Sequence, residues 1–328
     1  MEQKIAHRLP GRAWPRLRIG LVGAGRSRQG LGPFLAKWFE HHGAVVAGIA
    51  GRNEDRTRAV AVSLTEQLGH EVRSQELHEL AQSVDALVVA CPVEGHLAGL
   101  DAALAAGVPC LCEKPLVSPD RLRDALERIE QFRQRGLLLA ENCQWPFTLD
   151  AVQQLHPELL DRSGRSPRRR RLAMRLSPAW PGRTMVEDSL SHVLSLAQAI
   201  VPLSRTTQLE DLRAPNLILN HEEQCEIAFR LVDGGHEIDV TLCLECCPQQ
   251  PRPAWFELDG VRFDRRIGDS YAISFVSSQN RTANVEDPLS RLVYGFLQDL
   301  TAEPRERTRA DDVELRIRLY ASVLAAIG

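Results

Sequence analysis

Residues 84–115 read VDALVVACPVEGHLAGLDAALAAGVPCLCEKP. The apolar run Asp85–Cys91 predicts a buried strand, and the alanine- and leucine-rich segment Glu94–Ala106 predicts a helix that ends at Gly107. A second buried strand is expected over Val108–Cys112. Two strands that are apolar on both faces and are joined by a helix are typical of a parallel sheet covered by helices on each side.

The same alternation continues on both sides of this stretch. Strands are predicted over Leu17–Val22, Ala44–Ala50 and Leu137–Glu141. Helices are predicted over Pro33–His42, over the segment that follows a cap at Asn53, and over Pro119–Arg135. The pattern predicts an α/β Rossmann domain, a doubly wound parallel sheet, over residues 1–146, with residues 1–16 as a tail. We expect the domain boundary near Trp145–Thr148.

The pattern changes after Pro146. Turn signals separate strand-like segments at Gln224–Val232, Glu237–Cys246, Ala254–Leu258 and Val261–Arg265, and helices are predicted over Leu149–Leu160, Asp188–Ile200 and at the end of the chain. Residues 147–328 are therefore predicted to form an α+β substrate domain with an open, mostly antiparallel sheet. We interpret the arginine run Arg168–Arg171 as a solvated loop entering a strand, because a nucleic-acid footprint needs a wider basic face.

Composition excludes several classes of protein. The 328 residues suit two domains, and a net charge of −3 gives no basic excess for nucleic-acid binding. We see no apolar run of membrane-spanning length and no secretory signal, and we expect a cytoplasmic protein without a membrane partner. The eight cysteines are expected to be reduced core thiols. No metal site is predicted, since Cys243, Cys246 and Cys247 lack a second pair of ligands with suitable spacing.

The segment Gly23-Ala24-Gly25-Arg26-Ser27 follows the first predicted strand and precedes a helix. Here the backbone of a dinucleotide-binding domain approaches the pyrophosphate, and glycine permits the turn and the close approach. The third glycine of the usual motif is replaced by Arg28, and Gly30 and Gly32 come later, as if the loop were lengthened. An ordinary turn is the alternative, but the strand–turn–helix context favours a dinucleotide.

The end of the second strand indicates which dinucleotide is preferred. An NAD domain usually carries Asp or Glu at this point, whereas this chain has Arg52 and Asn53. Arg52 would meet the 2′-phosphate of NADP(H), and Asn53 could help, so we predict NADP(H) in preference to NAD(H). The alternative is a solvated Arg52, with Glu54 or Asp55 taking the acidic role.

Two further segments carry groups suited to catalysis. Only three of the 40 basic residues are lysine, and one of these, Lys114, lies after Glu113 at the carboxyl end of a predicted strand, where open parallel sheets bind ligands. Its ammonium could stabilise negative charge on a reacting oxygen, although a surface lysine is the alternative. Asp188 and His192 stand four apart on a predicted helix, so the imidazole could transfer a proton while the aspartate orients it; a structural cap is the alternative.

Together these segments resemble the Gfo/Idh/MocA oxidoreductase family, from about Arg18 to the end of the chain, most specifically over residues 84–115. The resemblance implies that Lys114 faces the nicotinamide and the substrate, and that the Lys114–Pro115 bond is cis. It also implies an acid/base role for Asp188 and His192, and a homodimer or higher homo-oligomer formed through the late strands. The cofactor-contacting residues that it implies in the specific stretch are Cys91, Pro92, His96 and Glu113.

Two segments depart from the family pattern, and both are expected to border the substrate. Residues 141–147 read ENCQWPF in place of an Asn-Arg-Arg-Phe-like segment, and residues 180–183 read WPGR in place of a glycine-rich one. Trp145 and Trp180 could stack on a ring of the substrate, and Arg183 could hold an anionic group. Packing roles are the alternatives, and packing is favoured for Trp145.

We therefore predict an NADP(H)-dependent oxidoreductase that transfers hydride to or from a carbonyl, alcohol or imine carbon of a small polar substrate such as a sugar derivative. Two alternatives differ in class. One is a non-catalytic NADP-binding sensor or scaffold. The other is a hydrolase or lyase that oxidises its substrate transiently with a retained nicotinamide.

Overall fold

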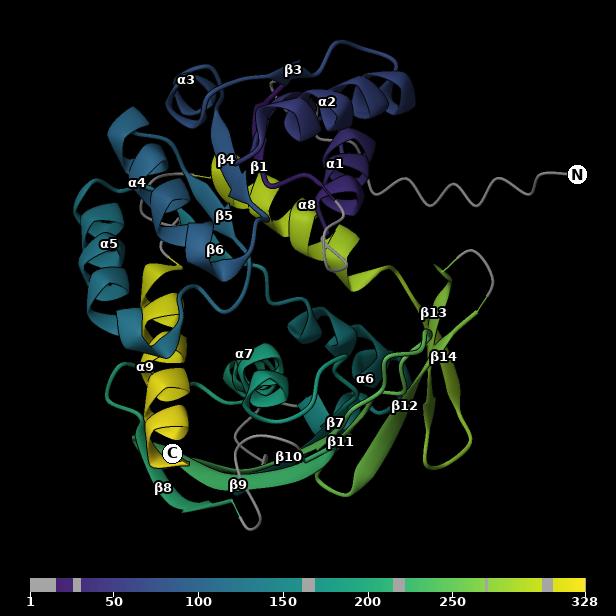
Figure 1. Cartoon of the computed structure of the whole chain (residues 1–328). Helices are drawn as coiled ribbons and strands as arrows, with labels where there is room; N and C mark the ends of the chain where they lie inside the picture. Colours follow the sequence, from purple (N-terminus) through teal and green to yellow (C-terminus); the bar gives the residue numbers. More distant parts are fainter. Residues whose placement is uncertain are drawn as a thin grey trace, which may run out of the picture.

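The computed structural model describes residues 16–25, 31–160, 169–214, 222–268, 271–302 and 309–327. Its first sheet has six strands in the order β3-β2-β1-β4-β5-β6, and every paired strand runs parallel to its neighbour (Figure 1). The predicted Rossmann sheet is confirmed. The strands are β1 (Arg18–Val22), β2 (Val45–Ala50), β3 (Arg73–Ser74), β4 (Ala86–Val89), β5 (Cys110–Cys112) and β6 (Leu139–Glu141).

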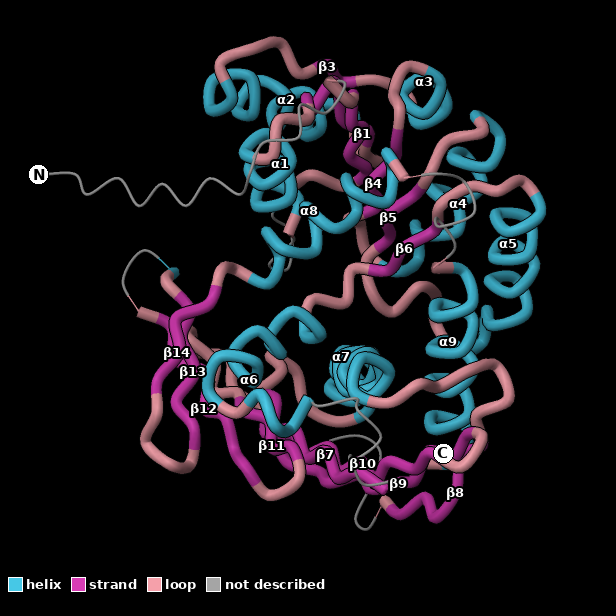
Figure 2. Tube along the Cα trace, turned by 180° about the vertical axis from the view of Figure 1, so that it is seen from behind, coloured by secondary structure: helices cyan, strands magenta, loops and turns pink. Residues whose placement is uncertain are grey.

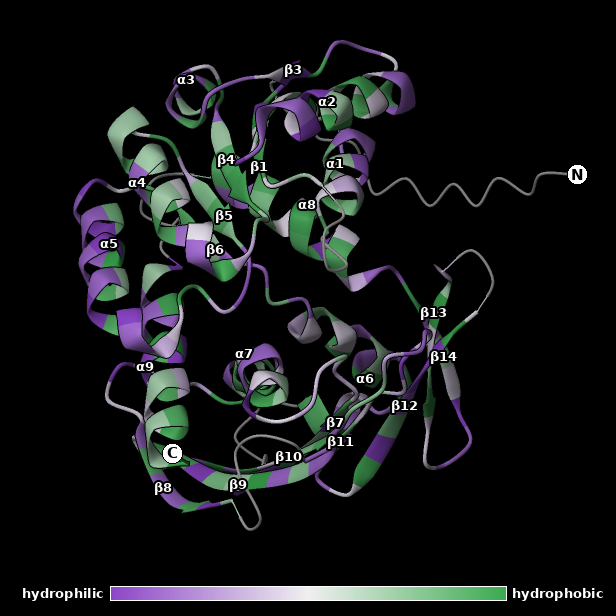
Figure 3. Cartoon of the chain, in the orientation of Figure 1, coloured by the Kyte–Doolittle hydropathy of each residue, from purple (hydrophilic) through white to green (hydrophobic). Residues whose placement is uncertain are grey.

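Helices bury both faces of this sheet, which explains why its strands are apolar on both sides. Figure 3 shows the hydrophobic colouring of β1, β4 and β5 and a hydrophilic outer side on α5. One face packs against α1 (Gly32–His41), α2 (Glu54–Leu68) and α8 (Pro288–Thr301). The other packs against α3 (Leu77–Gln82), α4 (His96–Ala106), α5 (Leu122–Gln134) and the start of α9 (Ala310–Ala326). Short 3-10 turns, η2 (Val93–Gly95) and η3 (Pro119–Arg121), precede α4 and α5.

The second sheet has eight strands in the order β14-β13-β12-β11-β7-β10-β9-β8. Only the central β7–β10 pair is parallel, so the predicted mostly antiparallel sheet is confirmed. Helices lie on one face and leave the other open (Figure 2). The strands are β7 (Arg169–Leu176), β8 (Gln208–Arg213), β9 (Gln224–Asp233), β10 (His236–Glu245), β11 (Trp255–Leu258), β12 (Val261–Ile267), β13 (Ile273–Ser277) and β14 (Thr282–Val285). The short helices before β7 are η4 (Trp145–Thr148), α6 (Leu149–Leu155) and η5 (Pro157–Leu160), and α7 (Arg183–Ile200) follows it.

The prediction of a solvated loop over Arg168–Arg171 is wrong for three of these arginines, and Arg168 lies outside the described residues. Residues 169–171 lie inside β7, where alternate side chains point to opposite faces of the sheet. Arg170 is buried and pairs with Asp259 at 2.6 Å, whereas Arg169 pairs with Asp239 on the outer side. Similar pairs run over the outer face, including Arg230 with Asp239. Assembly of copies through this sheet stays a prediction.

Helix α7 begins earlier than predicted, at Arg183 rather than Asp188, after Gly182 at φ 69°. The extra turn brings Arg183 and Glu187 onto the helix, where they form an ion pair at 2.8 Å. In the described part of the chain, no helix combines the length and the apolar character needed to cross a membrane.

Helix α9 joins the two layers. Val313 and Ile317 pack on the first sheet, while Leu319 and Tyr320 pack in the core of the second. Between them, Arg316 pairs with Glu141 of β6 at 2.7 Å, and both side chains are buried. Glu141 also accepts the Leu116 backbone N–H at 3.0 Å, so this pair fixes the loop that follows Lys114.

We predict that Arg316→Met lowers the free energy of unfolding by roughly 3–5 kcal/mol, because it leaves the Glu141 carboxylate buried without its cation. The double variant Glu141→Gln/Arg316→Met should regain most of this loss. Urea unfolding measures both. The control is Arg123→Met, whose exposed pair with Glu127 should contribute about 0–1 kcal/mol. An equal loss in Arg316→Met and Arg123→Met would contradict the prediction.

Candidate active site

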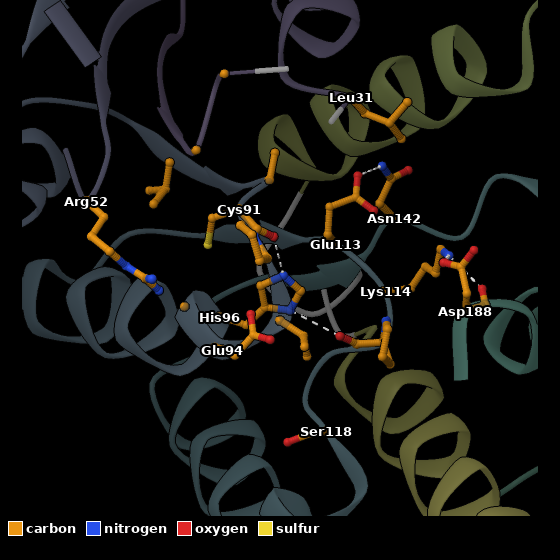
Figure 4. A pocket seen from close by; sticks show the side chains of 18 of the residues that line it. Leu31, Arg52, Cys91, Glu94, His96, Glu113, Lys114, Ser118, Asn142 and Asp188 are labelled. Atoms are coloured by element: carbon orange, nitrogen blue, oxygen red, sulfur yellow. Dashed lines mark hydrogen bonds and ion pairs between the residues drawn. The ribbon is translucent and has the colours of Figure 1, made fainter. Parts of the chain in front are cut away.

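A cleft of about 1310 Å³ lies along the carboxyl ends of the first sheet and extends to α7 of the second layer. In Figure 4, Arg52 lies at one end of the view and the Lys114–Asp188 pair at the other, with Cys91, His96 and Glu113 between them. The cleft is therefore elongated, and both layers of the molecule contribute to its walls. Each predicted site residue that the structure describes lines it, except Trp145.

Two glycines of the first loop are required by close packing. Gly23 has φ +82°, and a Cβ there would lie 2.5 Å from the Cys91 Cα. A Cβ on Gly32, the first residue of α1, would lie 2.6 Å from the Ala24 Cα. Gly32 thus allows the helix to pack closely against the loop. The third glycine of the usual motif has this role, and its position in this chain, residue 28, lies four residues earlier. Arg26 and Ser27 lie outside the described residues.

Gly25 differs from these two glycines. A Cβ built on it would make only ordinary contacts, 3.5 Å from the Arg56 side chain and 3.9 Å from that of Val60, so packing does not demand glycine there. The cleft wall at Gly25 is therefore open backbone, which suits close approach of a phosphate group.

The end of β2 presents two arginines to the cleft. Arg52 lines it as predicted, and so does Arg56 from the first turn of α2. Asn53 accepts the Arg56 backbone N–H at 2.8 Å and so caps this helix. Glu54 pairs instead with Arg58 at 2.5 Å, and neither Glu54 nor Asp55 lines the cleft. Carboxylates that do line the cleft include Glu76, from the loop after β3, and Glu94, from the loop after β4.

The loops after β4 and β5 are joined through buried His96. One ring nitrogen lies 2.9 Å from the Cys91 carbonyl, and the other lies 3.1 Å from the Pro115 carbonyl. Cys91 itself lines the cleft, where burial raises the pKa of its thiol to about 11. His96 therefore holds the two loops together, and Cys91 is a neutral thiol at neutral pH rather than a nucleophilic thiolate.

Glu113 is held by a neighbour that sequence reasoning missed. Asn142 donates to Glu113 at 2.5 Å, and burial raises the pKa of this carboxyl to about 7. The Asn142 side-chain oxygen is buried in the cleft wall and has no hydrogen-bond partner among the described residues. A buried acceptor of this kind requires a donor from a ligand or from water.

Lys114 joins the two layers of the molecule at the cleft. Its Nζ donates to the Asp188 side chain and to the Asp188 carbonyl, both at 2.6 Å, and the Lys114–Pro115 peptide bond is cis as predicted. Burial by itself lowers the pKa of Lys114, but Asp188 outweighs it and leaves this pKa above the usual lysine value. The same ion pair outweighs burial at Asp188 and lowers the pKa of that carboxyl. Lys114 is therefore a charged donor with one N–H left for a third partner.

His192 lies one helical turn beyond Asp188 and also lines the cleft. Burial, followed by the charge of Lys114, places its imidazole pKa well below the usual value, so the ring is neutral at neutral pH. Among the described residues, Asp188 makes no hydrogen bond to His192, and the His192 Nδ1 is buried without a partner. The predicted orienting role of Asp188 is therefore corrected: its carboxylate binds Lys114, which reaches it from the first layer.

The three predicted substrate residues fall in different environments. Trp145 is buried, 6.4 Å from the His192 ring between centroids, and packs as favoured from the sequence. Trp180 is 62% exposed and lines the cleft. Arg183 also lines it, although its guanidinium pairs with Glu187. Tyr320 and Arg252 line the cleft as well, and neither had a local sequence signal that would have singled it out.

Comparison with known proteins identifies the first domain. Residues 17–143 match the family model of Gfo/Idh/MocA oxidoreductases, described as an NAD-binding Rossmann fold. The UDP-N-acetylglucosamine 3-dehydrogenase of Acidithiobacillus ferrooxidans is 29% identical over 55% of this chain and 53% of its own. The inositol 2-dehydrogenase of Streptomyces avermitilis is 32% identical over 48% of this chain and 45% of its own. The match thus spans about half the length of these curated relatives.

The likeness in fold extends over nearly the whole chain. A solved structure of the Acidithiobacillus ferrooxidans enzyme superposes with a TM-score of 0.66, covering 94% of this chain and 96% of that one at 20% identity. An identity this low shows the fold alone, and it shows it for both layers. The family match in residues 17–143 and the likeness in fold over both layers relate this chain to Gfo/Idh/MocA oxidoreductases.

Proposed function

We propose that this chain is an NADP(H)-dependent oxidoreductase that transfers hydride to or from a carbonyl or alcohol carbon of a sugar-like substrate. The observation that carries the proposal is the meeting of Lys114 and Asp188 at 2.6 Å, beside His192, in a cleft that begins at a glycine loop. The two relatives that match about half of this chain are named as dehydrogenases of an amino sugar nucleotide and of inositol. Both are polyhydroxylated compounds, which agrees with a sugar-like substrate here.

The cleft fits a dinucleotide. Open backbone at Gly25 suits a pyrophosphate, and the unpartnered oxygen of Asn142 and the carboxyl of Glu113 suit a polar group near the other end. Cys91, Pro92 and His96 would shape the wall between them. A bound nicotinamide would supply the site that accepts or donates hydride.

A preference for NADP(H) is supported by Arg52 and Arg56, which line the cleft at the end of β2. Two guanidinium groups suit a phosphate monoester, whereas an unmodified ribose is usually met there by a carboxylate. The adjacent Glu54 is engaged by Arg58 and does not line the cleft.

Three side chains would carry out charge stabilisation, proton transfer and positioning. The spare N–H of Lys114 would donate to the substrate oxygen and stabilise negative charge on it. Neutral His192 would take the hydroxyl proton when an alcohol is oxidised. Asp188 would hold the ammonium in place and balance its charge. Because its pKa is lowered, the His192 ring is in the unprotonated form that accepts this proton at neutral pH.

Lys114→Met should lower kcat by about 10²–10³-fold while leaving NADPH affinity within about twofold, since the ammonium stabilises charge that develops in the reaction. Turnover is followed at 340 nm with NADP+ and either UDP-N-acetylglucosamine or myo-inositol, and affinity by NADPH fluorescence. The control is Lys37→Met, on the exposed side of α1. Unchanged turnover in Lys114→Met would refute the role of this lysine. NADPH binding without turnover on any substrate would favour a sensor, and turnover without net change in NADPH would favour transient oxidation.

Arg52→Gln and Arg56→Gln should each weaken NADPH binding by about 10- to 100-fold and NADH binding by less than about threefold, because each removes a charge-assisted bond to the 2′-phosphate. Fluorescence titration of both nucleotides measures this. Arg58→Gln, on an exposed arginine two residues after Arg56 in α2, is the matched control. An equal loss for NADPH and NADH would reject the phosphate contact.

The pH profile tests His192. Because its pKa lies below 6.5, the rate of alcohol oxidation at saturating NADP+ should show no loss from His192 protonation between pH 8 and pH 6.5, and should fall only at lower pH. Titration of Glu113, near pH 7, is separated by working in Glu113→Gln. In that background, His192→Asn should reduce kcat by about 10²–10⁴-fold and abolish the acidic limb. The same acidic limb in Glu113→Gln and in the double variant Glu113→Gln/His192→Asn would show that another group is the base.

A further inference from the structure

Arg265 is a partly buried cation on the inner face of the second sheet. It lies two residues from Phe263 on β12 and so shares the face that packs into the core. Its guanidinium carbon lies 5.5 Å from the centre of the Trp145 ring, on the side of the molecule that holds His192. Burial and the charge of Arg252 lower the pKa of Arg265.

No carboxylate compensates this charge among the described residues. Arg265 forms no ion pair there, and its Nε is buried without a hydrogen-bond partner. Its Nη2 donates to the Arg252 carbonyl at 2.9 Å, and its ring contact with Trp145 is a cation–π interaction. Neither replaces a counter-ion, since a buried charge is normally paired with an opposite one. The other buried cations at the core, Arg170 and Arg316, both have one.

A second cation connects Arg265 to the cleft. Arg252 lines the cleft wall near Asp188, whose pKa its charge helps to lower. The charge of Arg265 in turn helps to lower the pKa of His192. Lys114 is already balanced by Asp188, so the uncompensated guanidinium of Arg265 adds positive charge directly behind the cleft wall that Arg252 forms. This end of the cleft therefore favours an anion.

We propose that Arg252 and Arg265 form a subsite for an anionic oxygen group, a carboxylate or a phosphate ester, carried by the substrate next to the carbon on which Lys114 and His192 act. The inference rests on the proposed function and narrows its substrate class to sugar-like acids or sugar phosphates. Arg252 contacts the group from the cleft wall. Arg265 holds the Arg252 backbone and supplies the uncompensated charge.

Calorimetric titration of the NADP+-loaded protein with D-glucose, D-glucuronate and D-glucose 1-phosphate tests the subsite. The expected result is at least about 10-fold tighter binding of one or both anions than of glucose. Arg252→Gln and Arg265→Gln should each remove about 10- to 100-fold of the anion affinity and leave the glucose affinity within about threefold. Arg266→Gln, the exposed neighbour on the same strand, should change neither. The two anions distinguish a carboxylate site from a phosphate site.

Equal affinity for glucose and both anions, or no binding of either anion, overturns the subsite. So does an Arg265→Gln variant that shifts the pH profile of turnover while keeping the anion preference, because Arg265 would then act only on His192. Failure of the proposed function gives a different result: the anion preference persists, but none of the three probes is turned over.

Thermal unfolding provides a second test that does not depend on turnover. Without ligand, Arg265→Met should melt at the same temperature as the wild type or higher, because an uncompensated charge is removed. D-glucuronate or D-glucose 1-phosphate should raise the melting temperature of the wild type more than that of the variant. A variant that melts well below the wild type, or that gains the same protection, would show that Arg265 has only a structural role.

Discussion

The ion pair between Lys114 and Asp188 depends on the whole architecture of this protein. Lys114 follows the fifth strand of the first sheet, and Asp188 lies on the helix that fills the second layer. Two features hold them together: α9 packs on both layers, and the Arg316–Glu141 pair fixes the loop after Lys114. The contact then determines the electrostatics nearby: it keeps the lysine charged and the aspartate ionised, and it helps to keep His192 neutral.

Neighbouring groups are thereby given different proton affinities by their surroundings. Asp188 holds a charged ammonium with a spare N–H, and a neutral imidazole lies one helical turn from Asp188. This arrangement is suited to stabilising an oxyanion at one atom and accepting a proton at another. Glu113, with a pKa of about 7, adds a third titrating group at the cleft. In the proposed subsite, the positive charge near Arg252 and Arg265 attracts an anionic group of the substrate.

Local patterns predicted much of this structure. The run over residues 84–115 predicted the strands and the helix, because buried parallel strands are apolar on both faces, and the scarcity of lysine pointed to Lys114. Contacts that depend on distant packing were not predictable in this way. Gly32 takes the place of a motif glycine only because α1 packs on Ala24, and Arg56 becomes a cleft residue through the turn of a helix that looks solvated in sequence. Charge counting likewise could not show that Arg170 is paired while Arg265 is not, because the carboxylate of Asp259 reaches Arg170 from a turn 89 residues away in the sequence.

A crystal structure of the protein with NADP+ bound would test the central claim most directly. The account predicts that the adenosine 2′-phosphate contacts Arg52 and Arg56, that the pyrophosphate lies on the backbone of Gly25, and that the nicotinamide ring is flanked by Lys114 and His192. A dinucleotide bound with its nicotinamide away from both side chains would contradict it.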